Sequence, residues 1–189
     1  AWACPQAVKQ HRPLSRAEAK KRVGITSIDF IVLFVGNLLP HKGVSLLIEA
    51  ASLLRNIGLS FRVLIVGDGP EQNAVQELIR TKGLTNVVSL RGSVPDLVPY
   101  YSAADVFVLP SIYEAFGIVL LEAMASGVPV VASALPGVRK VFSSGREGFL
   151  AEPGNAIDLA NKIDLILSNP DKQKAMSQAA RRLVEEKYS

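Results

Sequence analysis

Short runs of consecutive apolar residues recur along this chain, and stretches with helical spacing separate them. The runs occupy residues 31–35, 62–66, 87–90, 105–109, 128–132 and 148–150. Nearly continuous apolar runs are typical of parallel strands, because helices cover such a sheet on both faces. The alternation therefore predicts an α/β fold built on a doubly wound parallel sheet of about six strands.

Turn and capping residues place the helices between these runs. The predicted helices span residues 15–23, 43–57, 71–82, 95–104, 117–126, 138–142, 155–167 and 171–188. Ser15 and Glu18 form a capping-box pattern at the start of the first helix, and Asn169-Pro170 separates the last two. Residues 1–14 lack periodicity, and we interpret them as a linker. Ligands of doubly wound sheets bind at the carboxyl ends of the strands, which is where most of the loops considered below lie.

Composition narrows the function only in part. The 189 residues fit one domain, and the net charge of +4 weakly favours anionic ligands. Basic residues are scattered and not interleaved with aromatic ones, which argues against nucleic acid. One cysteine rules out an intramolecular disulfide, and two histidines make a histidine-rich metal site unexpected. Because the first residue is Ala1, we expect a fragment or a processed chain.

Glu114 and Glu122 bracket the most informative segment, in which Gly117 lies at a predicted strand-to-helix turn. A helix that begins there offers free backbone amides to an anion. The flanking carboxylates would repel that anion and suit neutral hydroxyl groups instead. A sugar nucleotide has this pattern, with a diphosphate at the helix end, ribose on one side and hexose on the other. Either glutamate alone would be read as a surface charge, but a carboxylate within an otherwise apolar helix such as that of Glu122 needs a reason.

Three further loops follow predicted strands. Lys42 precedes a helix start, where a cation suits a phosphate, although a solvated surface lysine is an equally good reading. Turn formation alone explains the 67–70 segment, so we interpret Asp68 as structural. Arg91, after the third strand, is suited to stacking on a nucleobase.

Five segments together resemble the retaining glycosyltransferases of the GT-B fold, most closely glycosyltransferase family 4, also called glycosyl transferases group 1. They are 36–43 (GNLLPHKG), 66–70 (VGDGP), 103–111 (AADVFVLPS), 114–122 (two glutamates with seven residues between them) and 124–132 (MASGVPVVA). The resemblance extends from about residue 15 to the C-terminus. It implies one Rossmann-like half of a GT-B enzyme, with residues 15–189 as the C-terminal domain that binds the nucleotide sugar. The N-terminal acceptor domain would be missing from this chain.

The resemblance also implies residue roles. Glu114 would contact the donor hexose, Glu122 the ribose, and Lys42 the departing diphosphate, which makes Glu114 and Lys42 the catalytic pair. The implied donor-binding positions are Gly36, Asn37, Lys42, Arg91, Gly92, Val94, Glu114, Phe116, Gly117, Ile118, Val119 and Glu122. Three positions depart from the family pattern: Asn37 stands where arginine is most frequent, Lys140 where glutamate is usual, and Ala115 where glycine or proline is frequent.

The implied reaction is transfer of a hexose with retention of configuration, without a bound metal or other cofactor. The donor would be a UDP-, GDP- or ADP-sugar, and a carbohydrate or lipid-linked acceptor would bind through the missing domain. The enzyme would work in the cytoplasm or peripherally at the inner face of the membrane, without nucleic acid. Two alternatives remain: a sugar-nucleotide epimerase of the same fold, and a nucleotide-binding module without catalytic activity.

Overall fold

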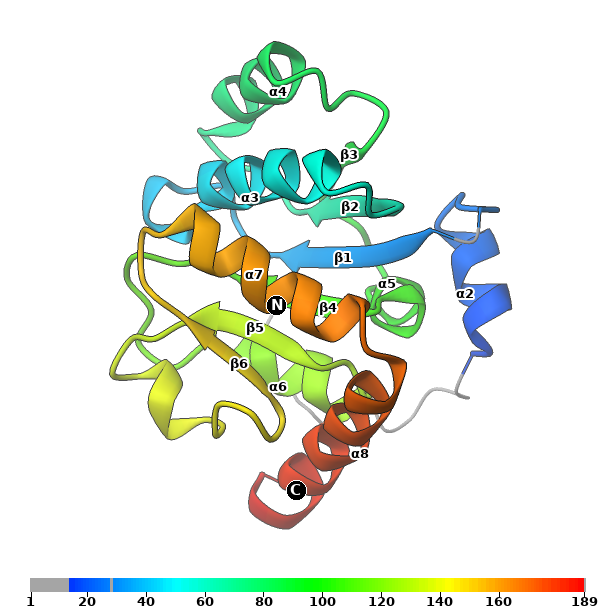
Figure 1. Cartoon of the computed structure of the whole chain (residues 1–189), viewed down its shortest axis with the longest axis vertical. Coiled ribbons are helices and arrows are strands. Elements are labelled where there is room, and N and C mark those ends of the chain that lie inside the picture. The colour runs from blue at the N-terminus through cyan, green and yellow to red at the C-terminus, as the bar shows by residue number, and fades with distance from the viewer. Residues whose placement is uncertain (1–13, 28, 189) are drawn as a thin grey trace.

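The computed structural model describes residues 14–27 and 29–188, so the predicted linker lies outside the described residues except for Leu14. Six strands form one sheet in the order β3-β2-β1-β4-β5-β6, and every neighbouring pair is parallel. This confirms the predicted doubly wound, Rossmann-like sheet (Figure 1). The strands are β1 (Phe30–Val35), β2 (Phe61–Val66), β3 (Val88–Gly92), β4 (Val106–Leu109), β5 (Val130–Ser133) and β6 (Gly148–Ala151).

Helices cover both faces of the sheet. In Figure 1, α3 and α7 lie side by side in front of the strands, and α6 lies behind them. Helix α2 packs on α5, and α8 packs on α6. The helices are α2 (Arg16–Arg22), η1 (Pro40–Lys42), α3 (Val44–Asn56), α4 (Gln72–Thr81), α5 (Val98–Ala103), α6 (Ile118–Ala125), η2 (Val138–Lys140), α7 (Ala156–Leu167) and α8 (Pro170–Lys187).

Local capping explains several helix starts. The backbone amide of Glu18 donates to Ser15 Oγ, and the Ser15 amide donates to Glu18 Oε2 at 3.0 Å, so the predicted capping box is present. The side chains of Asn155 and Asn169 cap α7 and α8 in the same way. Satisfying these otherwise free amides stabilises each helix start by about 0.5–2 kcal/mol.

Three details differ from the expectations. Strand β3 continues through Gly92, so Arg91 and Gly92 are the last strand residues and not loop residues. Helix α5 is shorter than predicted, because its first residue is Val98. The turn η1, which contains Lys42, was not predicted, since three residues are too few for helical periodicity.

The order of the strands reverses between β1 and β4. The chain moves outward from β1 to β2 and β3, and then crosses back to place β4 on the other side of β1. The loops after β1 and β4 therefore leave the sheet in opposite directions, and a crevice at this point is where such folds bind ligands. The sequence places Lys42 on the first of these loops and Glu114 on the second.

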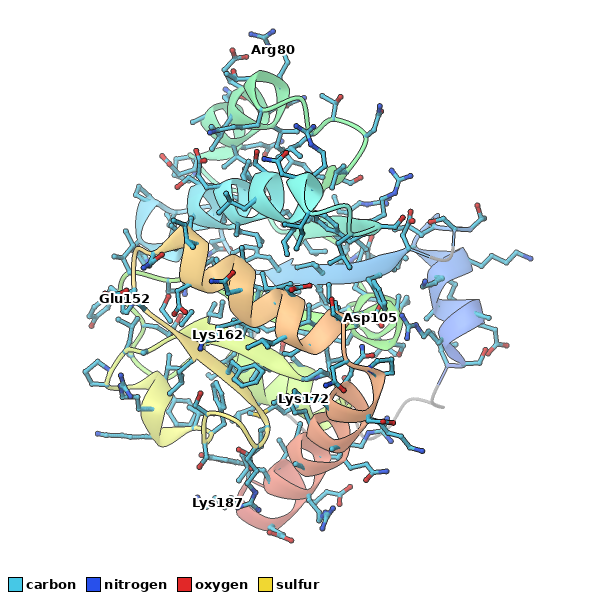
Figure 2. The ribbon with its side chains drawn as sticks, in the orientation of Figure 1. Arg80, Asp105, Glu152, Lys162, Lys172 and Lys187 are labelled. Carbon is cyan, nitrogen blue, oxygen red and sulfur yellow. The ribbon has the colours of Figure 1, made fainter. Side chains whose placement is uncertain are left out.

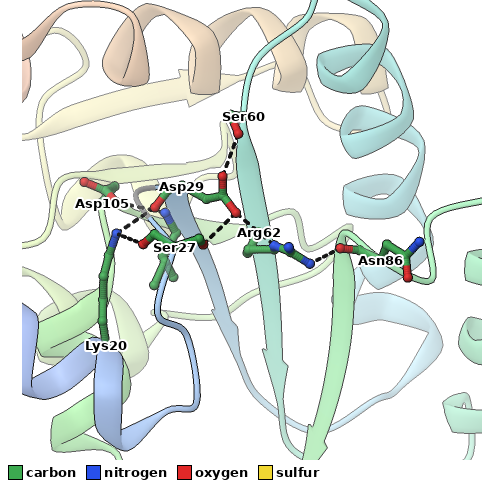
Figure 3. A network of polar contacts seen from close by, with 8 residues as sticks. Lys20, Ser27, Asp29, Ser60, Arg62, Asn86 and Asp105 are labelled. Carbon is green, nitrogen blue, oxygen red and sulfur yellow. Dashed lines mark hydrogen bonds and ion pairs between the residues drawn. The ribbon is translucent and has the colours of Figure 1, made fainter.

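The opposite, amino-terminal edge of the sheet carries two polar networks. Asp29 accepts hydrogen bonds from Ser27, Ser60 and Arg62, and so joins the segments that lead into β1 and β2 (Figure 3). Asp105, which is buried, accepts from the Ile31 amide at 2.8 Å and from Gln173 at 2.9 Å. It also pairs with Arg16 and lies between α2 and α8 (Figure 2).

Two lysines cover the side chain of Phe149 on the edge strand β6. The ammonium groups of Lys162 and Lys172 lie 5.7 and 5.5 Å from the centre of the Phe149 ring (Figure 2). At this distance the aromatic ring attracts the cations, which connects α7 and α8 to β6.

Candidate functional site

Lys42 and Glu114 meet beyond the carboxyl ends of β1 and β4, where the strand order reverses. Lys42 Nζ donates to Glu114 Oε2 at 2.7 Å, although the two residues are 72 positions apart in the chain. The side chains are 22% and 12% exposed, so the pair is accessible from solvent but partly desolvated. The two residues predicted to be catalytic are therefore in direct contact.

Close backbone packing explains why this pair forms. Gly43 caps α3 with φ 68°, and a Cβ added to it would lie 2.1 Å from the carbonyl oxygen of Pro110. Only glycine allows this approach, because a side chain would clash and the left-handed conformation would be strained. The Ile112 amide also donates to the His41 carbonyl at 2.8 Å. These contacts fasten the loop that carries Lys42 to the loop that carries Glu114.

The N-terminus of α6 adjoins the pair. Gly117 is the N-cap with φ 76°, and its amide donates to Glu114 Oε1 at 3.2 Å. Among the described residues no side chain accepts from the next amides, those of Ile118 and Val119, so they are available to a ligand. The structure thus brings together a carboxylate, helix amides and a cation that the sequence places on separate loops.

Glu122 is buried one turn further along α6. It is 5% exposed, and Tyr101 donates its phenolic hydroxyl to Glu122 Oε2 at 2.9 Å. Burial raises the pKa of Glu122, and the hydrogen bond from Tyr101 opposes that rise. Burial, together with the adjacent Glu122 charge, also raises the pKa of Tyr101 well above its usual value. A carboxylate that is costly to ionise inside the protein is a frequent mark of a functional site.

The carboxyl ends of β1, β2 and β3 converge through glycines. A Cβ on Gly67 would lie 2.0 Å from the carbonyl oxygen of Gly36, and the Gly67 amide donates to the Gly92 carbonyl at 2.8 Å. Ser93 donates its hydroxyl to Asp68 at 2.8 Å. Asp68 therefore stabilises the ends of these strands, in agreement with its structural interpretation, while Gly36 and Gly92 lie along one continuous edge.

The remaining predicted positions differ in exposure and in the residues that they contact. Asn37 is exposed directly after Gly36, and Val94 is half-buried after β3. Phe116 is 39% exposed, and its ring meets that of Tyr188 edge-on at 6.2 Å. The guanidinium of Arg91 extends toward Gly24, and its buried Nε has no hydrogen-bond partner within the described part of the chain.

Two residues that support the site were missed from the sequence. Tyr101 is the partner of Glu122, and a buried glutamate signals that some partner exists but not which residue provides it. Gly137 packs so tightly that its Cβ would lie 2.1 Å from the Ala115 carbonyl oxygen and 2.8 Å from that of Glu114. In the sequence this glycine resembles any other loop glycine, because close approach between distant segments leaves no local pattern.

Metal sites and membrane-spanning helices are both absent from residues 14–27 and 29–188. Within these ranges no three histidine, cysteine, aspartate or glutamate side chains lie close enough to hold a metal ion. No described helix is both long enough and apolar enough to cross a membrane.

A parallel sheet with a cation, a carboxylate and an open helix end at its switch point defines a Rossmann-like domain that can bind an anionic ligand. Comparison with known proteins identifies the family to which this domain belongs. The family model described as glycosyl transferases group 1 matches residues 15–183, and the chain belongs to this family. The predicted family is thereby confirmed at the level of group 1 glycosyltransferases.

Two relatives and one solved structure illustrate the match. The chain is 35% identical over 176 residues to an alpha-D-kanosaminyltransferase of Streptomyces kanamyceticus, covering 92% of this chain and 45% of that protein. It is 33% identical to a D-inositol 3-phosphate glycosyltransferase of Arthrobacter, with coverage of 89% and 41%. HepE from Anabaena, solved with UDP and glucose, superimposes with a TM-score of 0.88 at 26% identity, over 99% of this chain and 51% of that one. The chain thus spans less than half the length of these curated relatives.

Proposed function

We propose that this chain is the donor-binding domain of a retaining glycosyltransferase that transfers a hexose from a nucleotide sugar. One observation carries the proposal: the contact between Lys42 and Glu114 at the open N-terminus of α6. This arrangement offers a cation and amides to a diphosphate, and a carboxylate to sugar hydroxyls, within a few ångströms of one another. HepE, a structural relative with the same fold, binds UDP and glucose, which supports a nucleotide-sugar donor.

Each contact has a distinct role in the proposed binding mode. The diphosphate accepts hydrogen bonds from the α6 amides and Lys42, the ribose hydroxyls donate to Glu122, and the hexose hydroxyls donate to Glu114. Gly36, Asn37, Arg91, Gly92 and Val94 line the side where the base and phosphates lie. As the bond from the anomeric carbon to the diphosphate oxygen breaks, Lys42 neutralises the charge that develops on the leaving group.

The acceptor, a carbohydrate or a lipid-linked sugar, would bind to a second domain in the parent protein. The parent would work in the cytoplasm or at the inner face of the membrane. Because positioning of the acceptor supplies a large part of the rate, we expect residues 1–189 alone to bind the donor but to transfer it very slowly.

Calorimetry of this chain with UDP, GDP and ADP in the presence of EDTA tests the proposal. At least one nucleotide should bind without a divalent metal, and Lys42→Ala should weaken it by about 1.5–3 kcal/mol, or roughly 10- to 150-fold. Lys82→Ala provides the matched control, because Lys82 forms a surface ion pair with Glu49 at the same 2.7 Å distance. If the chelator abolishes binding, or if both alanine variants lose the same affinity, the proposed site is wrong.

A further inference from the structure

The Glu114 carboxylate already occupies the site that we assign to the diphosphate. One of its oxygens accepts from Lys42 Nζ at 2.7 Å, and the other accepts from the Gly117 amide at the N-terminus of α6 at 3.2 Å. A cation and a helix-end amide are the donors that a phosphate group would use. The protein therefore holds a carboxylate of its own at the donors of its anion site.

A diphosphate that uses Lys42 and the N-terminus of α6 competes with this carboxylate. Both are anions, so they repel each other strongly if they contact these donors together at a few ångströms. When the diphosphate enters, Glu114 has to give up both contacts, and it needs new hydrogen-bond donors because it remains only partly exposed.

The backbone around Glu114 is fixed, so the exchange requires only a side-chain rotation. Gly137 packs against the Glu114 and Ala115 carbonyls, and the Ile112 amide is held by His41. The flanking side chains, by contrast, are open: Tyr113 is 70% exposed and Phe116 is 39% exposed. The exchange that we infer is therefore a turn of the Glu114 side chain toward solvent, with the loop kept in place.

We propose that this internal competition makes the site discriminate against a bare nucleoside diphosphate in favour of the nucleotide sugar. The hexose supplies hydroxyl groups that receive the displaced carboxylate, whereas a nucleoside diphosphate displaces Glu114 and offers it nothing. Glu114 is therefore a specificity-determining residue that weakens binding of the product left after sugar transfer and promotes its release. This inference rests on the proposed function, and it adds a role for Glu114 as a competitor of the diphosphate for Lys42 and the N-terminus of α6.

Glu114→Gln separates the two roles, because it removes the charge and keeps the shape. We expect the affinity for UDP to rise about tenfold in the variant, which corresponds to about 1.4 kcal/mol. The affinity for UDP-glucose should rise much less or fall, because the amide is a weaker acceptor for the sugar hydroxyls. Isothermal titration of both ligands against wild type and variant gives the ratio directly, and GDP and ADP with their glucose derivatives replace the uridine pair if UDP does not bind.

Two further variants keep the test decisive. Glu49→Gln breaks the surface ion pair with Lys82 and should leave both affinities unchanged. Glu114→Ala replaces Glu114→Gln if thermal unfolding shows that the glutamine variant does not fold, and it should also bind the bare diphosphate more tightly than wild type. An unchanged or reduced affinity for the bare diphosphate in the folded variant overturns the inference while the proposed function stands. If no nucleotide binds to wild type or to either variant, the proposed function itself fails.

Discussion

The hydroxyl of Tyr101 donates to the buried carboxylate of Glu122 across 2.9 Å and so connects α5 to α6. This bond occupies one carboxylate oxygen and fixes the orientation of the other. Burial raises the pKa of both residues, which keeps Tyr101 neutral and makes the ionised carboxylate of Glu122 costly. The protein retains a carboxylate where an apolar or neutral side chain would be more stable, which points to a role in binding.

Glu122→Gln should make the domain more stable and bind nucleotide more weakly. The folded-state pKa of Glu122 is raised, so ionisation costs stability as the pH rises through that value, and an amide avoids this cost. The gain in Tm should therefore be clear at pH 7 and disappear near pH 4, where the wild-type carboxyl is also protonated in both states. Scanning calorimetry over this range measures it, and a variant less stable than wild type at pH 7 would contradict the prediction.

Nucleotide affinity provides the second half of the Glu122 test. Loss of a charged hydrogen-bond acceptor for the ribose should weaken UDP and UDP-glucose alike, by about tenfold or more. This contrasts with Glu114→Gln, for which the two ligands should change by different factors. A loss confined to UDP-glucose would place Glu122 beside the hexose instead of the ribose.

Gly43→Ala should both destabilise the fold and weaken nucleotide binding. Alanine in a left-handed conformation costs about 1–2 kcal/mol, and the clash with the Pro110 carbonyl should add about 1–3 kcal/mol. The control is Gly58→Ala at the other end of α3, where φ is 81° but no atom lies within 4 Å of the added Cβ. Denaturant unfolding should show a clearly larger loss of unfolding free energy for Gly43→Ala than for Gly58→Ala. Equal losses would show that the close approach of Gly43 to Pro110 does not contribute to stability.

Asp29 should make the domain sensitive to acid. Hydrogen bonds from Ser60, Ser27 and Arg62 lower the pKa of Asp29 from 3.8 to about 2. Stability from this network is complete above the unfolded pKa and is lost as the pH falls through about 2. Unfolding free energies measured between pH 6 and pH 2 should decline by on the order of 1–2 kcal/mol more in wild type than in Asp29→Asn. Parallel pH profiles for the two proteins would rule out this contribution.

Asp105→Ala should be among the most damaging substitutions outside the site. It leaves the buried Ile31 amide without its acceptor, which should cost about 1–3 kcal/mol. It also removes the ion pair with Arg16 and one of the two Asp105 oxygens that accept from Gln173. Asp164→Ala is the control, because Asp164 only accepts a hydrogen bond from Ser168 on an exposed helix surface. Similar unfolding free energies for the two variants would be evidence against the anchoring role of Asp105.

Local patterns in the sequence predict the strands, most helices and the order of elements, because apolar periodicity and caps depend on neighbouring residues. The sequence also identifies Lys42, Glu114 and Gly117 as residues of one site, because loops at the same ends of parallel strands must meet. It does not predict that Glu114 occupies the anion site. From the sequence, removal of Glu114 should leave the affinity for a bare diphosphate unchanged, since the carboxylate is expected to touch only the sugar. That expectation changes because a 2.7 Å contact between residues 72 positions apart depends on tertiary packing.

The pairing of Tyr101 with Glu122 and the packing of Gly137 on the Glu114 loop were missed for the same reason. Each joins segments about 20 residues apart that no turn or periodicity connects. Single-residue patterns show that a buried charge needs a partner and that a glycine permits close approach. They do not show which distant segment meets that need.

The polar networks of Asp29 and Asp105 lie at the amino edge of the sheet, whereas the Lys42–Glu114 pair lies at the carboxyl edge. Substitutions at the two edges share no contacts, so their effects on stability should add independently. Substitutions in the loops that carry Lys42 and Glu114 can therefore accumulate at one edge without weakening the bonds that hold the strands at the other.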